Sequence, residues 1–219
     1  DDIPITLSTV MQNIIDDKTL DVSQGIIHHS EGVDLLPSNI EMSGFEVRLI
    51  NAMSRERVLK TYVNEVKKNY DYVLIDCMPS LGMITINALA AADSVIIPTQ
   101  PHYLSAKGLE LLLRSVSMVK RQINPKLRID GILMTMVMPR TNISKEITAT
   151  VKSAYGKKIK VFDTEIPHSI RAVEATAEGK SIFAYDKSGK VAAAYEQLGK
   201  EVAEIGEKQR NQNRADRIR

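Results

Sequence analysis

The stretch YVLIDCMPSLG, residues 72–82, decides the fold. Its first four residues are apolar and lack the polar alternation of a strand with one solvent-facing side. We therefore expect a strand over 72–75 that is buried on both faces, as strands of parallel sheets are. Asp76 follows at the carboxyl end of this strand, where α/β sheets place their ligands. A turn and then a helix are predicted to follow.

Outward from this stretch, short apolar runs alternate with helical patterns. Strands are predicted over 33–37, 94–98, 130–137 and 160–162, and helices over 43–69, 105–122, 144–155 and 191–209, with a further helix ending over 87–92. This alternation predicts an α/β fold with a mainly parallel sheet flanked by helices. The length of 219 residues suits one domain, 1–219, whose basic end over 208–219 is predicted to be a frayed, solvated tail.

Composition narrows the function classes. The net charge of +2 is too small to indicate a nucleic-acid binder by itself, so any DNA binding must come from a local patch. No run of 18 apolar residues occurs, and no transmembrane helix is expected. The lone cysteine, Cys77, cannot form an internal disulfide, which fits a reducing compartment, and it is expected to be a small core residue. The four histidines show no metal-binding spacing and are expected at the surface.

Asp76 is the most informative single residue. A carboxylate at the end of an apolar strand can help to hold Mg²⁺ beside nucleotide phosphates, as in a Walker B motif. Many such residues only cap a strand end, so the spacing alone is a weak signal. The flanking sequence therefore decides how Asp76 is interpreted.

That flanking sequence resembles the ParA/Soj/MinD family of deviant-Walker ATPases. YDYVLIDCMPSLG at 70–82 and TINALAAAD at 85–93 match the family's YDYIIIDCPPSLG and TINAL…AAD, and the later matches GILMTM, RTN and GKSI follow in family order. The likeness is closer to the ParA/Soj branch than to MinD. Two departures occur: Met78 replaces a turn proline, and Met138-Pro139 stands where the family has an Asp before RTN.

The resemblance implies a P-loop NTPase-like fold of the SIMIBI type and a Mg²⁺-dependent ATPase that partitions DNA. Asp76 would act in catalysis and hold Mg²⁺, directly or through water, and the remaining ATP contacts would come from Pro79, Met136 and Pro167. Arg171 matches a DNA-contacting arginine, and Arg140, Lys145 and Lys180 are weaker candidates. The implied partners are non-specific DNA, a ParB-like centromere-binding protein and a second copy in an ATP-bound homodimer. A cytoplasmic, nucleoid-associated location without membrane contact is expected.

Two family motifs are absent from the chain: the phosphate-binding loop KGGxGKT and the DxDPQ strand. Gly179-Lys180-Ser181 does not replace the loop, because Glu174 stands where the pattern needs glycine. We therefore expect a sequence truncated by roughly forty to fifty residues, about one βαβ unit with a tail. The intact protein would be the enzyme, whereas this chain alone would expose sheet edges and bind ATP poorly.

Three other functions share the fold. A MinD-like membrane-positioning ATPase needs a C-terminal amphipathic helix with bulky apolar residues, and residues 211–219 contain only Ile218 of that kind. An electron carrier like the nitrogenase iron protein needs two cluster cysteines, and one cysteine argues against it. A non-catalytic adaptor that kept the fold and lost the phosphate loop remains the alternative from a different class.

Overall fold

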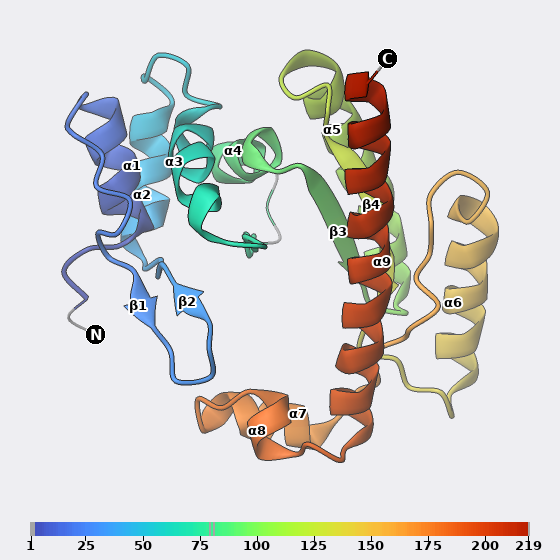
Figure 1. Ribbon diagram of the computed structural model, residues 1–219. Helices are drawn as coiled ribbons and strands as arrows, with labels where there is room; N and C mark the ends of the chain where they lie inside the picture. The colour runs from blue at the N-terminus through green and yellow to red at the C-terminus, as the bar shows by residue number, and fades with distance from the viewer. Residues whose placement is uncertain (1–2, 79, 81, 219) are drawn as a thin grey trace. The chain divides into compact units, whose positions relative to one another are not determined.

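A computed structural model describes the backbone of residues 3–78, 80 and 82–218, with side chains described as far as residue 212 (Figure 1). The chain divides into two compact units. Unit 1 comprises residues 1–93 and 114–127, and unit 2 comprises residues 94–113 and 128–219. The expectation of one domain over 1–219 stays a prediction, because two compact units can belong to a single domain.

Unit 1 is mainly helical. Its elements are α1 (Leu7–Ile15), a β1 (Ile27–His28) and β2 (Asp34–Leu35) hairpin, α2 (Glu41–Leu49), α3 (Val58–Val66), the 3₁₀ helix η1 (Lys67–Asn69) and α4 (Met83–Ala91). Residues four apart share one face of a helix, and α3 uses this spacing to bury Leu59 and Val63. They pack with Met11, Phe45 and Leu49 in the core of this unit.

Unit 2 contains the parallel strand pair. β3 (Ser94–Thr99) pairs with β4 (Arg128–Met134), and single parallel bridges extend the sheet from Ile132 to Val161 and from Val137 to Pro167. Its helices are α5 (Tyr103–Gln122, whose last nine residues belong to unit 1), α6 (Asn142–Tyr155), α7 (Ile170–Ala177), α8 (Ile182–Tyr185) and α9 (Lys190–Ile218).

Both faces of β4 are covered, as expected for a parallel strand. Ile132 and Met134 pack with Val151 of α6 in one cluster. Leu133, which points to the opposite face, packs with Phe162 and with Val191 of α9 in another. This arrangement of strands between helices confirms the predicted α/β fold with a parallel sheet.

The predicted strand over 72–75 is wrong. The segment is not helical and belongs to no strand ladder among the described residues, and Leu74 is 92% exposed. A strand is stabilised by a neighbour that accepts and donates its backbone hydrogen bonds, and an apolar pattern does not supply that neighbour. Ile75 at the end of the segment and Tyr70, two residues before its start, pack partly against the core of unit 1.

Other differences are smaller. Strand 160–162 is reduced to the bridge at Val161, and strand 33–37 to β2. Helices α1, α7 and α8 were not predicted. α9 continues to Ile218 instead of ending near residue 209, because the long polar stretch of the helix contains no Gly or Pro after Gly206 to stop it. The frayed character of 208–219 stays a prediction, since the side chains beyond residue 212 are outside the described part.

Candidate functional site

Hydrogen bonds join the turn that follows Asp76 to the start of α4. Thr85 donates its hydroxyl to the carbonyl of Ser80 at 2.6 Å, and the backbone N–H of Gly82 donates to the Ser80 hydroxyl at 3.1 Å. The N–H of Ser80 in turn donates to the Met78 carbonyl at 2.7 Å. The side chain of Thr85 is buried, so these bonds fix the turn from the helix side.

The position of α4 is itself fixed by a fully buried amide. The Asn87 side chain accepts a hydrogen bond from the N–H of Leu59 at 3.1 Å and donates to the carbonyls of Arg55 and Met83 at 2.8 and 3.0 Å. An amide oxygen and nitrogen that are both satisfied in this way specify one packing of α4 on α3. Sequence reasoning missed this residue, because two of its three partners, Leu59 and Arg55, lie far away along the chain.

The side chain of Asp76 is exposed. No group of three or more His, Cys, Asp and Glu that could hold a metal occurs in the described part of the chain. Mg²⁺ prefers oxygen ligands and is usually held by one or two carboxylates together with substrate phosphates and water. Asp76 therefore fits a nucleotide-dependent Mg²⁺ site, in which Mg²⁺ would neutralise phosphate charge, and not an all-protein metal cage.

Cys77, next to this carboxylate, is exposed and not the core residue that was expected. Its thiol lies 3.7 Å from the carbonyl oxygen of Ile75. Partial desolvation of the sulfur, and then the negative charge of Asp76, raise the pKa of the Cys77 thiol. The exposure follows from the missing strand ladder over 72–75. The predicted nucleotide contact at Pro79 lies outside the described residues.

Met136 and Pro167 are brought together in unit 2. Val137, which follows Met136, bridges Pro167, with its N–H donating to the Ile166 carbonyl at 3.0 Å and its carbonyl accepting from the N–H of His168 at 3.0 Å. Met136 is 51% exposed and has a φ of 53°, which is unusual for a residue with a side chain. The pair thus forms a half-exposed apolar edge after β4, and its nucleotide contact stays a prediction.

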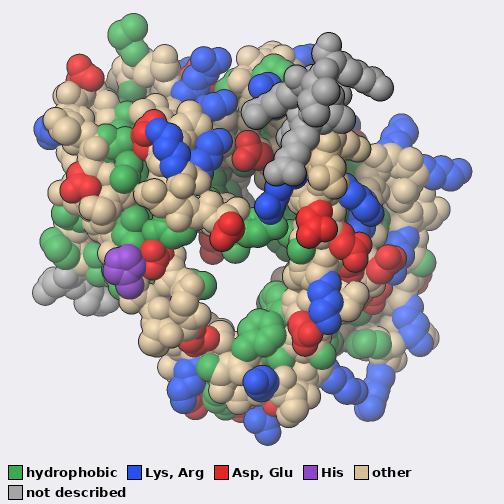
Figure 2. Space-filling view, in the orientation of Figure 1, with side chains coloured by type: hydrophobic (Ala, Val, Ile, Leu, Met, Phe, Trp, Pro, Cys, Tyr) green, Lys and Arg blue, Asp and Glu red, His purple; other side chains and the backbone are tan. Residues whose placement is uncertain are grey.

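The predicted DNA-contacting side chains are all on unit 2 and all exposed. Arg171 on α7 lies 3.7 Å from the Asp186 carboxylate, measured from Nε, and Lys180 lies 2.8 Å from Glu178. Hydrogen bonding to Glu178 raises the pKa of Lys180. Arg140 precedes α6, and Lys145 lies in its first turn. Figure 2 shows cationic and anionic side chains interspersed on the face in view.

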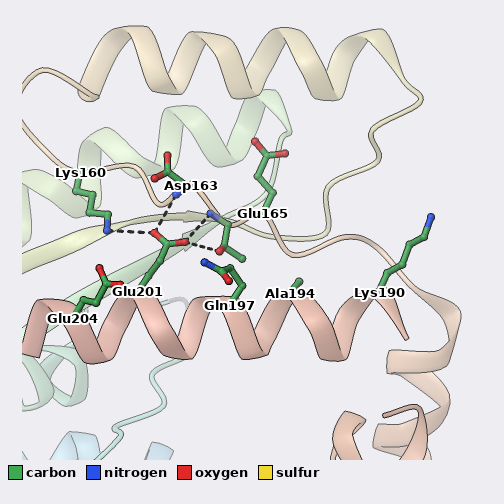
Figure 3. Close-up of a pocket in the computed structure, with 9 residues that line it drawn as sticks. Lys160, Asp163, Glu165, Lys190, Ala194, Gln197, Glu201 and Glu204 are labelled. Carbon is green, nitrogen blue, oxygen red and sulfur yellow. Dashed lines mark hydrogen bonds and ion pairs between the residues drawn. The ribbon is translucent and has the colours of Figure 1, made fainter. Parts of the chain in front are cut away.

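A hollow in unit 2 of about 630 Å³ lies along α9 and is lined by carboxylates and two lysines (Figure 3). Its Glu201 side chain accepts hydrogen bonds from the backbone N–H groups of Asp163 and Thr164 at 3.3 and 2.9 Å and lies 3.3 Å from Lys160. Burial opposes ionisation of Glu201, but the hydrogen bond from the Thr164 hydroxyl, followed by the two backbone bonds and the contact with Lys160, outweighs it and lowers the pKa of Glu201. Within this hollow, Glu201 therefore serves to attach α9 to the segment after Val161.

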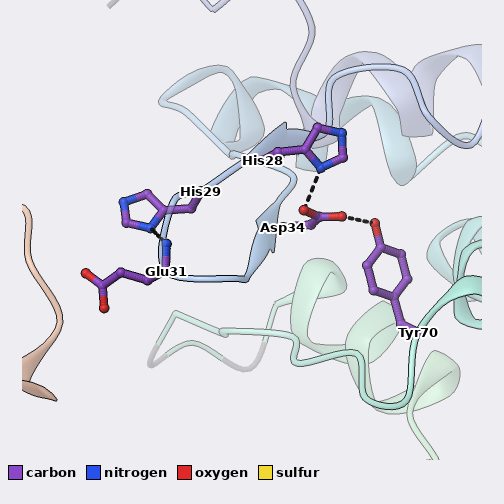
Figure 4. Close-up of polar contacts among 5 residues, drawn as sticks. All are labelled: His28, His29, Glu31, Asp34 and Tyr70. Carbon is purple, nitrogen blue, oxygen red and sulfur yellow. Dashed lines mark hydrogen bonds and ion pairs between the residues drawn. The ribbon is translucent and has the colours of Figure 1, made fainter. Parts of the chain in front are cut away.

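A second polar network joins the hairpin of unit 1 to Tyr70 (Figure 4). The Asp34 carboxylate lies 2.6 Å from Nδ1 of His28 and accepts a hydrogen bond from the Tyr70 hydroxyl at 2.6 Å. The hydrogen bond from Tyr70, and then the one from His28, lower the pKa of Asp34. The four histidines are exposed, as predicted.

Comparisons with known proteins agree with the likeness seen in the sequence. The sequence profile of a family described as an AAA domain (AAA_31) matches residues 4–129. The sporulation initiation inhibitor protein Soj of Bacillus subtilis is 44% identical over 176 residues, covering 80% of this chain and 69% of Soj. The chain belongs to the ParA/Soj family.

Two further proteins are similar to this chain over most of its length. The chromosome partitioning protein ParA of Myxococcus xanthus is 36% identical over 196 residues, covering 89% of this chain and 68% of that protein. The structure of cobyrinic acid a,c-diamide synthase from Mycobacterium smegmatis is 30% identical with a TM-score of 0.74, covering 90% of this chain and 71% of the other. The same protein has been solved with an ATP analogue and magnesium.

The cell division ATPase MinD of Pyrococcus furiosus shares the fold alone, at 19% identity and a TM-score of 0.68, covering 94% of this chain and 78% of the other. No helix in the described part of this ParA/Soj family member has the length and apolar character needed to cross a bilayer. The chain spans about two thirds of the length of the curated relatives it matches.

Proposed function

We propose that the protein is a Mg²⁺-dependent ATPase of the ParA/Soj type that partitions DNA, and that it binds DNA without sequence preference as an ATP-bound homodimer. The observation that carries this proposal is the 44% identity to Soj over 80% of the chain. The match to the chromosome partitioning protein ParA supports the same cellular role.

The proposed chemistry uses Asp76 as the Mg²⁺-side carboxylate. Its position before a turn whose Ser80 is hydrogen-bonded to Thr85 and Gly82 at the start of α4 supports this role. Mg²⁺ with ATP is supported as the cofactor by the relative solved with an ATP analogue and magnesium. Arg171, with Arg140, Lys145 and Lys180, would supply cations to DNA phosphates, and a ParB-like protein would be the regulatory partner at the nucleoid.

The test is ATP turnover by the protein produced from its complete reading frame. We expect Asp76→Ala to lower turnover by about 100-fold, because a charge that stabilises the reacting phosphates is lost. Asp71→Ala, which removes another exposed carboxylate of the same segment, is the matched control and should leave turnover unchanged. Equal turnover in wild type and Asp76→Ala would remove Asp76 from the mechanism.

DNA retention tests the second half of the proposal. We expect Arg171→Glu to weaken retention on non-specific duplex DNA and to reduce its salt dependence, while ATP binding is kept. Lys157→Glu makes the same charge change at an exposed position outside the predicted contacts and is the control. Loss of ATP binding together with DNA retention in Arg171→Glu would indicate a structural role for this arginine.

A second candidate function comes from the name of the Mycobacterium smegmatis structure, which is 30% identical. A synthase that makes cobyrinic acid a,c-diamide converts two carboxylates to amides, so it would form ADP from ATP only when cobyrinic acid and an ammonia-supplying donor are both present. ADP formation that depends on cobyrinic acid and is indifferent to DNA would replace the partition proposal with this one.

A further inference from the structure

Helix α4 begins without an N-terminal cap of its own. Its N-cap residue is Gly82, which has no side chain, and no acidic residue occurs in its first turn. The first N–H groups of a helix lack intrahelical partners, and the helix dipole places partial positive charge there. A helix that starts immediately after the Asp76 turn therefore needs an acceptor from elsewhere.

Glu46 of α2 supplies that acceptor. Its carboxylate oxygen Oε1 accepts a hydrogen bond from the backbone N–H of Ile84, the second residue of α4, at 3.3 Å. The side chain is half-buried, which reduces the screening of its charge by water. Glu46 thus provides both the oxygen and the negative charge that the start of α4 lacks.

The same carboxylate explains why residue 82 is glycine. Gly82 has a φ of −73°, a value that any residue adopts, so backbone conformation does not require glycine here. A Cβ placed on Gly82 would lie 2.1 Å from Oε1 of Glu46. Because Glu46 is flexible at its end, a methyl group at position 82 would displace the carboxylate.

We propose that Glu46 is a positioning residue for the Asp76 turn, acting through the N-terminus of α4. At the start of α4, the Thr85 hydroxyl donates to the Ser80 carbonyl at 2.6 Å and the Gly82 N–H donates to the Ser80 hydroxyl at 3.1 Å. The N–H of Ser80 in turn donates to the carbonyl of Met78. Removing the Glu46 carboxylate frays the first turn of α4 and loosens these bonds. The inference rests on the proposed function, since Asp76 matters to the reaction only if the protein is a Mg²⁺-dependent ATPase.

The test is a mutant cycle on the protein from its complete reading frame, with the Mg²⁺ concentration for half-maximal ATP turnover as the readout. We expect Glu46→Ala and Gly82→Ala each to raise this concentration by about three- to tenfold, the range that a lost helix cap supports. The double variant should be no worse than either single variant, because both changes remove the same contact. Glu46→Gln, which keeps an acceptor oxygen but loses the negative charge, should fall between wild type and Glu46→Ala.

Glu41→Ala is the matched control on α2, because Glu41 is an exposed glutamate in the first turn of the same helix. A purely structural role would lower the active fraction without moving the Mg²⁺ requirement. Effects of Glu46→Ala and Gly82→Ala that multiply in the double variant, or a wild-type Mg²⁺ requirement in Glu46→Ala, would overturn the proposal.

The midpoint of thermal unfolding of the nucleotide-free variants distinguishes failure of the proposed ATPase function from failure of the proposed role of Glu46. If wild type shows no Mg²⁺-dependent turnover, the proposed function fails, whereas the shared contact still predicts equal losses of thermal midpoint in both single variants and the double variant. If turnover is present and the midpoints fall independently, the Glu46 inference fails and the proposed function stands.

Discussion

Residues 72–75 and β3 have nearly the same sequence character and opposite structural outcomes. Both are short apolar runs with β-branched residues, and both were predicted as buried strands. Ile97 of β3 is 2% exposed between β4 and its covering helices, whereas Leu74 is 92% exposed and in no ladder. The difference shows that an apolar run makes a segment able to form a buried strand. Whether it does so depends on a neighbouring strand that can share its backbone hydrogen bonds.

The largest expected effect comes from truncating one apolar side chain in each run and comparing the free energies of unfolding. Ile97→Ala should lower the free energy of unfolding by about 2–5 kcal/mol, because it leaves a cavity in the core of unit 2. Leu74→Ala should change it by less than about 0.5 kcal/mol, since the side chain is already in water. Urea unfolding of both variants measures the two values. A cost for Leu74→Ala comparable to that for Ile97→Ala would contradict the exposure of Leu74.

A smaller loss of stability is expected at Glu201, which joins α9 to the segment after Val161. The pKa of Glu201 is lowered from its ordinary value of 4.5, so its ionised form adds stability above that pH, and the contribution is lost as pH falls through the lowered pKa. Glu201→Gln should be less stable than wild type at pH 7, and the gap should close in acid. Urea unfolding across this range tests it, with exposed Glu204→Gln as the control. A gap independent of pH would mean that packing, not charge, explains the loss.

The smallest effect is expected at Tyr70, next to the exposed run 72–75. Tyr70→Phe removes the hydrogen bond that contributes most to the lowered pKa of Asp34, so this pKa should rise toward its ordinary value. His28→Gln removes the weaker contribution and should raise it less. Carboxyl chemical shifts followed by NMR through the acid range measure both. No change in Tyr70→Phe would show that the contact at 2.6 Å does not persist in solution.

The sequence predicted β3, β4, α5 and α6 because their patterns report burial on a sheet or along a helix face. The contacts that fix the candidate site were not predictable in this way. Asn87 and Glu46 bond to backbone groups on other elements, and such pairings depend on tertiary packing. The likeness to ParA/Soj singled out Asp76, whose spacing alone was ambiguous, and its role stays a prediction. The exposure of Cys77 follows from the absence of a strand ladder over 72–75 among the described residues, which the local sequence pattern does not report.

The exposed run after Tyr70 also affects how the chain behaves in concentrated solution. Unpaired β-prone segments are templates for edge-to-edge association between molecules, and charges at their ends limit it. Asp71 and Asp76 flank this run on either side. We therefore expect Asp76→Ala to be less soluble than wild type, so its solubility should be measured alongside its ATP turnover.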